Sequence, residues 1–164
     1  MPADGMVREA VIMRVRERVV SGPEEECVTL EYRALTREFV EIRDYVLRKG
    51  ETITAFTGDK EAVRIRVEDI LYFEAVGELV FAYLESNVYE IKLRLYQVEE
   101  RLRAARIMRA SKSVLLNPEY IVSVRPALTG RLYARMENGE EVLISRHYAK
   151  QIADYIMEDE YEGV

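Results

Sequence analysis

The sequence predicts a mostly β protein of the α+β class, with short helices between the strands and a small strand-strand-helix unit at its N-terminus. From residue 51 onward, short apolar or alternating runs are bounded by turn residues, which is typical of strands. An Asn138-Gly139 pair separates two such runs and favours a tight hairpin. Helical spacing of apolar residues is limited to segments near 35–46, 91–102 and 147–157. Strands therefore dominate the predicted fold.

The first 58 residues are predicted to form the strand-strand-helix unit. Residues that alternate with polar ones predict the two strands: Val11, Met13 and Val15, then Val28, Leu30 and Tyr32. Apolar residues three and four apart predict the helix: Leu35, Phe39, Ile42 and Val46. Gly50 stands where a helix C-cap is expected. Such a unit is much shorter than a typical domain, so we expect no receiver domain within it.

The middle of the chain is predicted to hold paired strands and one helix. Strands are expected over residues 51–57, 62–66 and 70–73, and residues 79–84 are expected to pair with 88–91. One helix is predicted from its apolar face: Ile91, Leu95, Val98 and Leu102. Glu99 and Arg103 are spaced as an i,i+4 ion pair on this helix.

The C-terminal third is predicted to be a hairpin followed by a helix. Because Asn-Gly accepts positive φ at both central positions, a type I′ turn is expected at residues 138–139. One face of the hairpin is expected to be apolar: Leu132, Ala134, Met136, Val142 and Ile144. A helix over 147–157 would then dock on the sheet through Ile152, Tyr155 and Ile156.

Composition restricts the class of protein. The chain has 164 residues, of which 49% are hydrophobic and 33% charged, as in soluble globular proteins. The apolar run over 79–84 is far too short to cross a bilayer. The N-terminus lacks a signal pattern, and Cys27 is the single cysteine. We therefore expect a cytoplasmic protein without disulfide bonds.

Charge is unevenly distributed along the chain. The net charge of −6 argues against a nucleic-acid partner, but the acidity lies at the two ends, including an acidic tail over 158–164. Residues 92–112 hold seven basic residues and two acidic ones. Such a local patch is compatible with DNA, although a solvated helix face is an equally good interpretation.

Enzymatic motifs are missing from the sequence, so we expect no catalytic residues, no cofactor and no metal. No glycine-rich phosphate loop occurs, and one histidine and one cysteine cannot supply a conventional zinc site. Ser145 and His147 lack an orienting acid. The pairs Glu68-Asp69 and Glu140-Glu141 are better interpreted as turn residues.

Two segments, 109–117 and 144–148, place cations and small hydroxyls at the ends of apolar runs, a pattern suited to gripping phosphates. They belong to a series in fixed order: residues 67–74; Leu95, Glu99 and Leu102; Arg109, Ser111, Lys112, Ser113, Asn117 and Ile121; residues 130–132, 138–139 and 145–148. Over about a hundred residues, from 59 to 156, this series resembles the LytTR family of bacterial DNA-binding domains.

The resemblance implies an elongated stack of β-sheets whose loops enter successive major grooves of paired direct repeats near promoters and bend the DNA. Three regions would contact DNA, the first being the loop after residues 72–74. The second comprises Arg109, Ser111, Lys112 and Ser113, and the third comprises Ser145, Arg146 and His147. Lys112 and His147 would read base edges, whereas Arg109 and Arg146 would contact phosphate or make structural pairs.

The sequence departs from the family pattern at two of these regions. Residues 76–80 offer no polar side chain but Glu78, which would repel phosphate. His147 stands where arginine is frequent, so its contact would depend on pH. The alternative for His147 is a residue at a helix N-terminus whose ring makes a local hydrogen bond. For Lys112 the alternative is an edge-strand lysine that prevents aggregation, and Asn117-Pro118 is better interpreted as a turn.

These patterns together predict a sequence-specific transcriptional regulator that binds double-stranded DNA. Residues 59–157 would be the DNA-binding domain, and residues 1–58 would serve dimerisation, giving a homodimer, or partner docking. A membrane protein that restrains the regulator is a partner suggested by family analogy alone. The alternative is a protein-interaction module that keeps the fold with little DNA affinity, and a small-molecule-binding β domain is a more distant one.

Overall fold

The computed structural model describes residues 14–25, 27–103 and 105–162. These residues belong to two compact units, which meet in the sequence between Arg33 and Ala34. In the first unit, the predicted strand at Val28, Leu30 and Tyr32 is wrong, because this segment pairs with no other strand. In the other predicted strand, Val15 is not part of a strand, and Val11 and Met13 lie outside the described residues. Among the described side chains, Val15, Val28 and Tyr32 are exposed to solvent.

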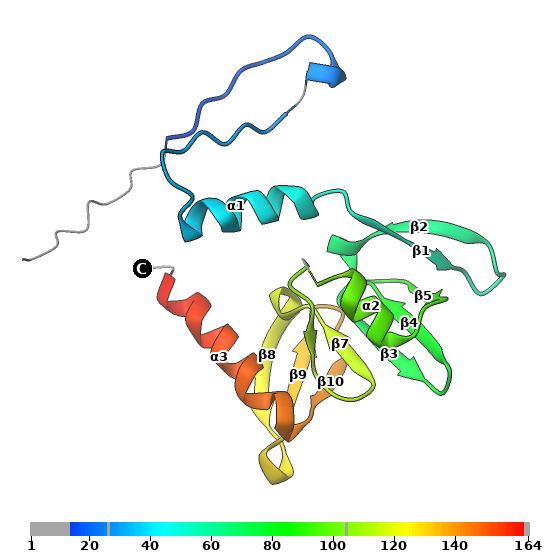
Figure 1. Cartoon of the computed structure of the whole chain (residues 1–164). Helices are drawn as coiled ribbons and strands as arrows, with labels where there is room; N and C mark the ends of the chain where they lie inside the picture. Colours follow the sequence, from blue (N-terminus) through cyan, green and yellow to red (C-terminus); the bar gives the residue numbers. More distant parts are fainter. Residues whose placement is uncertain (1–13, 26, 104, 163–164) are drawn as a thin grey trace, which may run out of the picture. The chain divides into compact units, whose positions relative to one another are not determined.

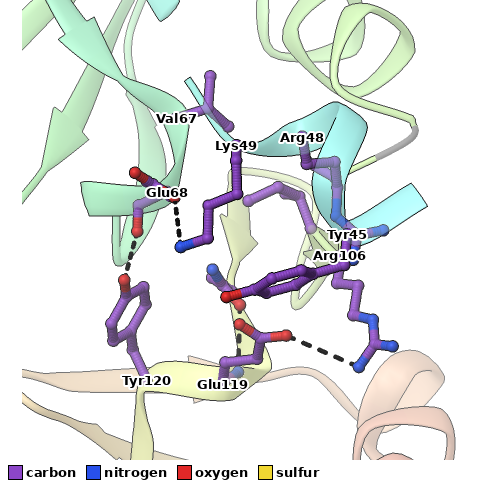
Figure 2. A pocket seen from close by; sticks show the side chains of 11 residues that line it. Tyr45, Arg48, Lys49, Val67, Glu68, Arg106, Glu119 and Tyr120 are labelled. Atoms are coloured by element: carbon purple, nitrogen blue, oxygen red, sulfur yellow. Dashed lines mark hydrogen bonds and ion pairs between the residues drawn. The ribbon is translucent and has the colours of Figure 1, made fainter. Parts of the chain in front are cut away.

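The second unit begins with the predicted helix, α1 (Arg37–Arg48), followed by Gly50 at a φ of 81°. The strand β1 (Thr52–Phe56) comes next, so the sheet begins before residue 59 and α1 belongs to the same compact unit as the strands. Lys49 joins the end of α1 to the β-rich part through an ion pair of 2.7 Å with Glu68 (Figure 2).

Seven antiparallel strands form the larger sheet, in the order β2-β1-β5-β4-β3-β7-β6 (Figure 1). After β1 these are β2 (Ala62–Arg66), β3 (Tyr72–Val76), β4 (Leu79–Tyr83), β5 (Val88–Ile91), β6 (Met108–Arg109) and β7 (Val114–Leu116). Tyr83 lies opposite Val88, which confirms the predicted hairpin between residues 79–84 and 88–91.

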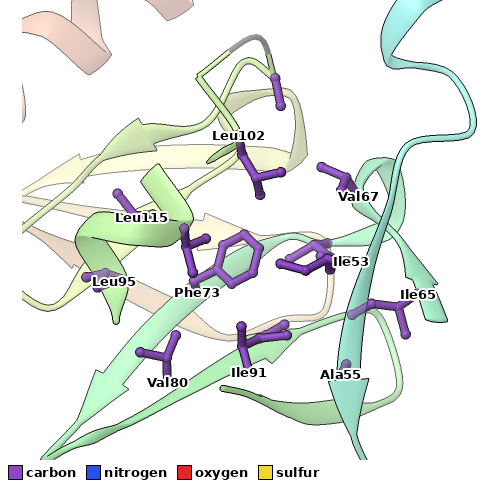
Figure 3. Packing of buried hydrophobic residues seen from close by; sticks show 14 residues of the cluster. Ile53, Ala55, Ile65, Val67, Phe73, Val80, Ile91, Leu95, Leu102 and Leu115 are labelled. Carbon is purple, nitrogen blue, oxygen red and sulfur yellow. The ribbon is translucent and has the colours of Figure 1, made fainter. Parts of the chain in front are cut away.

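Side chains on one face of this sheet pack against helix α2 (Leu95–Arg101). Phe73, at the centre of this cluster, is fully buried, as are Val98 and Leu102 on the helix side (Figure 3). The predicted apolar face is therefore confirmed at Leu95, Val98 and Leu102, whereas Ile91 belongs to β5. The predicted pair of Glu99 with Arg103 is wrong: α2 ends before Arg103, and Glu99 binds Arg109 instead.

The opposite face packs against a second, three-stranded sheet, β10-β9-β8. Its strands are β8 (Ile121–Pro126), β9 (Leu132–Met136) and β10 (Glu141–Ile144). The predicted apolar face is confirmed, since Ala134, Met136, Val142 and Ile144 are buried. Helix α3 (Arg146–Glu162) covers this cluster through buried Ile152 and runs beyond residue 157 into the predicted acidic tail.

The type I′ turn predicted for the β9–β10 hairpin is wrong. Gly139 has a φ of 84°, but Asn138 does not have positive φ. The Gly139 amide donates to the Met136 carbonyl at 2.9 Å, and the Met136 amide donates to the Glu140 carbonyl at 2.9 Å. This is a three-residue loop, in which a type I turn is followed by a left-handed glycine. The Asn138 side chain stabilises it by accepting from the Glu140 amide at 3.1 Å.

Candidate nucleic-acid interface

Three loops that are remote in sequence meet at one end of the stacked sheets. The first comprises residues 76–79, at the tip of the β3–β4 hairpin. The second comprises residues 110–113 between β6 and β7, and the third comprises residues 145–147 at the start of α3. We call these three segments the loop edge. The Ala75 amide, in β3 next to the first loop, donates to the Ser113 carbonyl at 2.7 Å and so joins the end of β3 to the second loop. The Ser145 amide donates to the Ala110 carbonyl at 2.8 Å, which joins the third loop to the second.

Arg109 supports the second loop through hydrogen bonds to its backbone. Its side chain is only 19% exposed, and its guanidinium forms a multidentate ion pair with Glu99 of α2. The remaining donor group, Nη1, binds the carbonyls of Ser111 at 3.3 Å and Lys112 at 3.2 Å. The bonds to Glu99 raise the pKa of Arg109, so the guanidinium stays charged. Of the two roles expected for Arg109, this geometry supports structural pairing.

In the second loop, the two serines contact each other and Lys112 is exposed to solvent. The Ser111 hydroxyl accepts from the Ser113 amide at 3.2 Å and lies 3.4 Å from the Ser113 hydroxyl. Lys112 is exposed at the tip. It lies in the loop between β6 and β7 rather than on an edge strand, and its ammonium is therefore presented on a braced backbone.

The third loop begins α3. The Ser145 carbonyl accepts from the amides of Tyr148 and Ala149 at 3.0 Å, which starts the helix. Arg146 and His147 are exposed in its first turn, and the His147 ring lies edge-on to Tyr148 with 4.7 Å between centroids. Arg146 packs against the β8–β9 loop, where a Cβ on Gly130 would lie 3.2 Å from Arg146 Cγ. The first turn of α3 thus presents the side chains of Arg146 and His147 to solvent.

The first loop is a tight hairpin that carries an acid. Gly77 has a φ of 61°, and Val76 and Leu79 are exposed beside it. Glu78 is 87% exposed at the tip and lies 3.6 Å from the guanidinium of Arg94. Sequence reasoning missed this contact, because the sequence places Arg94 only within the basic run over residues 92–112.

The rest of that basic run is divided between different parts of the fold. Lys92 lies 4.0 Å above the Phe56 ring. Arg106 lies 3.7 Å from Glu119 and lines a cavity of 170 Å³ beside α1, together with Lys49 and Tyr120 (Figure 2). The run is therefore not a single basic face. Asn117 is buried and accepts from the Glu119 amide at 3.1 Å, which confirms the turn interpretation.

Within the described residues, no three histidine, cysteine, aspartate or glutamate side chains are grouped as metal ligands would be. None of the helices in the described part of the chain combines the length and the apolar character that a membrane crossing requires.

Comparison with known proteins places this fold among DNA-binding domains. The family model described as the LytTr DNA-binding domain matches residues 60–157. A solved LytTr DNA-binding domain from Bacillus cereus has a TM-score of 0.58 and 23% identity, over 64% of this chain and 95% of that one.

Two curated relatives that match this chain come from Staphylococcus aureus. An uncharacterized HTH-type transcriptional regulator of strain NCTC 8325 is 30% identical over 108 residues, covering 66% of this chain and 72% of the relative. Its counterpart in strain MRSA252 is 29% identical over the same length.

The chain belongs to the LytTR family of DNA-binding domains. The resemblance inferred from the ordered motifs is thereby confirmed, and so is the mostly β fold of stacked sheets with short helices. The family model describes a DNA-binding domain, and both relatives are named as transcriptional regulators.

Proposed function

We propose that this chain is a sequence-specific transcriptional regulator that inserts its loop edge into the major grooves of paired direct repeats near promoters. The observation that carries the proposal is the pair of backbone hydrogen bonds, Ala75 to Ser113 and Ser145 to Ala110, that brings three distant segments together. Loops braced in this way can follow a phosphate-lined groove without reordering on binding, which lowers the entropic cost of association.

Individual roles follow from exposure and from the hydrogen bonds already made. Lys112 and His147 are exposed and are proposed to read base edges, since both can donate to guanine O6 or N7. Contacts to DNA phosphates, which would fix the orientation of the protein on the duplex, are proposed for Arg146, Ser111, Ser113 and Ser145. Arg109 belongs to the interface through its support of the loop carrying Lys112.

The test is binding of the full chain to the DNA upstream of its own gene, measured by fluorescence anisotropy at several salt concentrations. We expect Lys112→Ala and His147→Ala each to cost about 1–3 kcal/mol and to relax preference at one position of the site. Arg64→Ala is the matched control, because Arg64 lies on β2 at the opposite edge of the large sheet. Equal affinity of the parent for this DNA and for a random duplex would rule out the proposal.

A second candidate is a protein-interaction module with little DNA affinity. The observation that favours it is the exposed carboxylate of Glu78 at the loop edge, together with the net charge of −6. The same titration separates the two functions. A DNA-binding regulator loses affinity steeply as salt increases, whereas a module without DNA affinity shows no binding at low salt.

The proposal also covers the location of the protein in the cell and the role of its N-terminal residues. We place the protein in the cytoplasm and assign residues 1–58 to homodimerisation or to docking of a partner, with a membrane protein as one such partner. Exposed apolar side chains support this role, since Val19 is 99% and Val28 is 64% exposed.

A further inference from the structure

We propose that Arg94 supplies the phosphate contact that the β3–β4 hairpin itself lacks. This inference rests on the proposed function and adds a binding residue from a different element. The first loop of the loop edge has no cation of its own, and its tip carries Glu78. Arg94 reaches this tip from the segment between β5 and α2.

Strand register explains why Arg94 lies there. Val80, near the start of β4, is opposite Ile91, the last residue of β5. Because the strands are antiparallel, the chain leaving β5 runs past the start of β4 towards the hairpin tip. The Arg94 backbone is then fixed by its amide, which donates to the Gln97 side chain at 2.8 Å.

The guanidinium is held at the tip by two contacts with one residue. Nη1 donates to the Glu78 carbonyl at 3.3 Å, and Nη2 lies 3.6 Å from the Glu78 carboxylate. A guanidinium has five N–H donors in a planar fork, so these contacts leave donors for a phosphate. Arg94 remains 54% exposed, which keeps those donors accessible to solvent.

The ion pair itself is too weak to hold Arg94 away from DNA. A solvent-exposed pair contributes little to stability, and the carboxylate of Glu78 is 87% exposed. A phosphate approaching the tip would meet Arg94 already in position, while Glu78 would lower the affinity. The tip thus combines one attractive and one repulsive charge, and Arg94 compensates for the acid.

The experiment uses the full chain, its own upstream DNA and a random duplex of equal length. If Arg94 neutralises one phosphate, Arg94→Ala should reduce the slope of log affinity against log salt by about one. The expected loss of affinity is then about 15-fold at 50 mM salt and about fourfold at 200 mM. Both duplexes should lose affinity by the same factor, because a phosphate contact carries no sequence information.

Matched variants distinguish this role from a structural one. Arg94→Lys should restore the slope, Glu78→Gln should tighten binding, and Arg64→Ala should behave as the parent. Thermal unfolding of each variant verifies that the hairpin remains folded.

An unchanged salt slope in Arg94→Ala, with the parent still preferring its own DNA, would overturn this inference and leave the proposed function standing. Loss on the specific duplex alone would overturn it as well, since that result indicates a base contact. A parent that shows no preference for its own DNA overturns both.

Discussion

Arg109 illustrates how a mostly buried residue can support the proposed interface. Its guanidinium binds Glu99 on one side and the carbonyls of Ser111 and Lys112 on the other. A cation that is four-fifths covered is a poor phosphate ligand but a good brace for the loop that carries Lys112. In the proposed interface, the Arg109 side chain therefore links the geometry of the Lys112 loop to DNA affinity.

Replacing Arg109 should lower both the stability of the fold and the affinity for DNA. Arg109→Ala removes charge-assisted hydrogen bonds and should lower the free energy of unfolding by about 1–3 kcal/mol, measured by urea denaturation. Arg109→Lys keeps the charge but loses the planar fork and should recover part of this loss. DNA affinity should fall in the same order. Full stability of the alanine variant would contradict the bracing role.

At the scale of elements, the β9–β10 hairpin depends on one left-handed residue. Gly139→Ala forces a Cβ into positive φ and should cost about 1–2 kcal/mol of stability. Asn138→Ala should cost less, because Asn138 loses only the hydrogen bond to the Glu140 amide. Thermal melts of the two variants check this order. A type I′ turn would make Asn138→Ala costly too, since both central residues would then need positive φ.

Helix α1 should loosen in acid. The hydrogen bond from Lys49 lowers the pKa of Glu68, so the pair stabilises the attachment above the ordinary carboxyl range. This contribution is lost as the pH falls through the lowered pKa of Glu68. Hydrogen-exchange protection factors over residues 37–48 should decrease there, and Glu68→Gln should reproduce the decrease at pH 7. Peptides from β3 and β7 are the internal control, and unchanged protection in Glu68→Gln would contradict the prediction.

At the scale of the whole molecule, the boundary of the N-terminal unit decides how its role is tested. Deleting residues 1–58 would remove β1, which pairs with β2 and β5 and carries buried Ile53. Deleting residues 1–33 leaves the second compact unit whole. We expect the full chain to sediment as a dimer and the shorter deletion as a folded monomer. If both proteins sediment with the same number of chains per particle, residues 1–33 have no role in dimerisation.

Local patterns in the sequence were sufficient to predict most helices and strands and to identify the family. Alternation and helical spacing identified α1, the strand pairs and α3, because each depends on residues that are close together in the chain. The same alternation failed at residues 28–32, since a strand also needs a partner to accept its backbone hydrogen bonds. The spacing of Glu99 and Arg103 failed because Arg109, ten residues away, lies closer in space.

The tertiary structure decided how the loops come together. No spacing in the sequence places Ser145 beside Ala110, or Arg94 beside Glu78, because these contacts depend on strand register and on the stacking of two sheets. The sequence by itself determined the family, the class of fold and the segments that carry cations and hydroxyls. Only the packed sheets determined which cations are exposed, which are braces, and that Arg94 stands at the tip of a hairpin to which it does not belong.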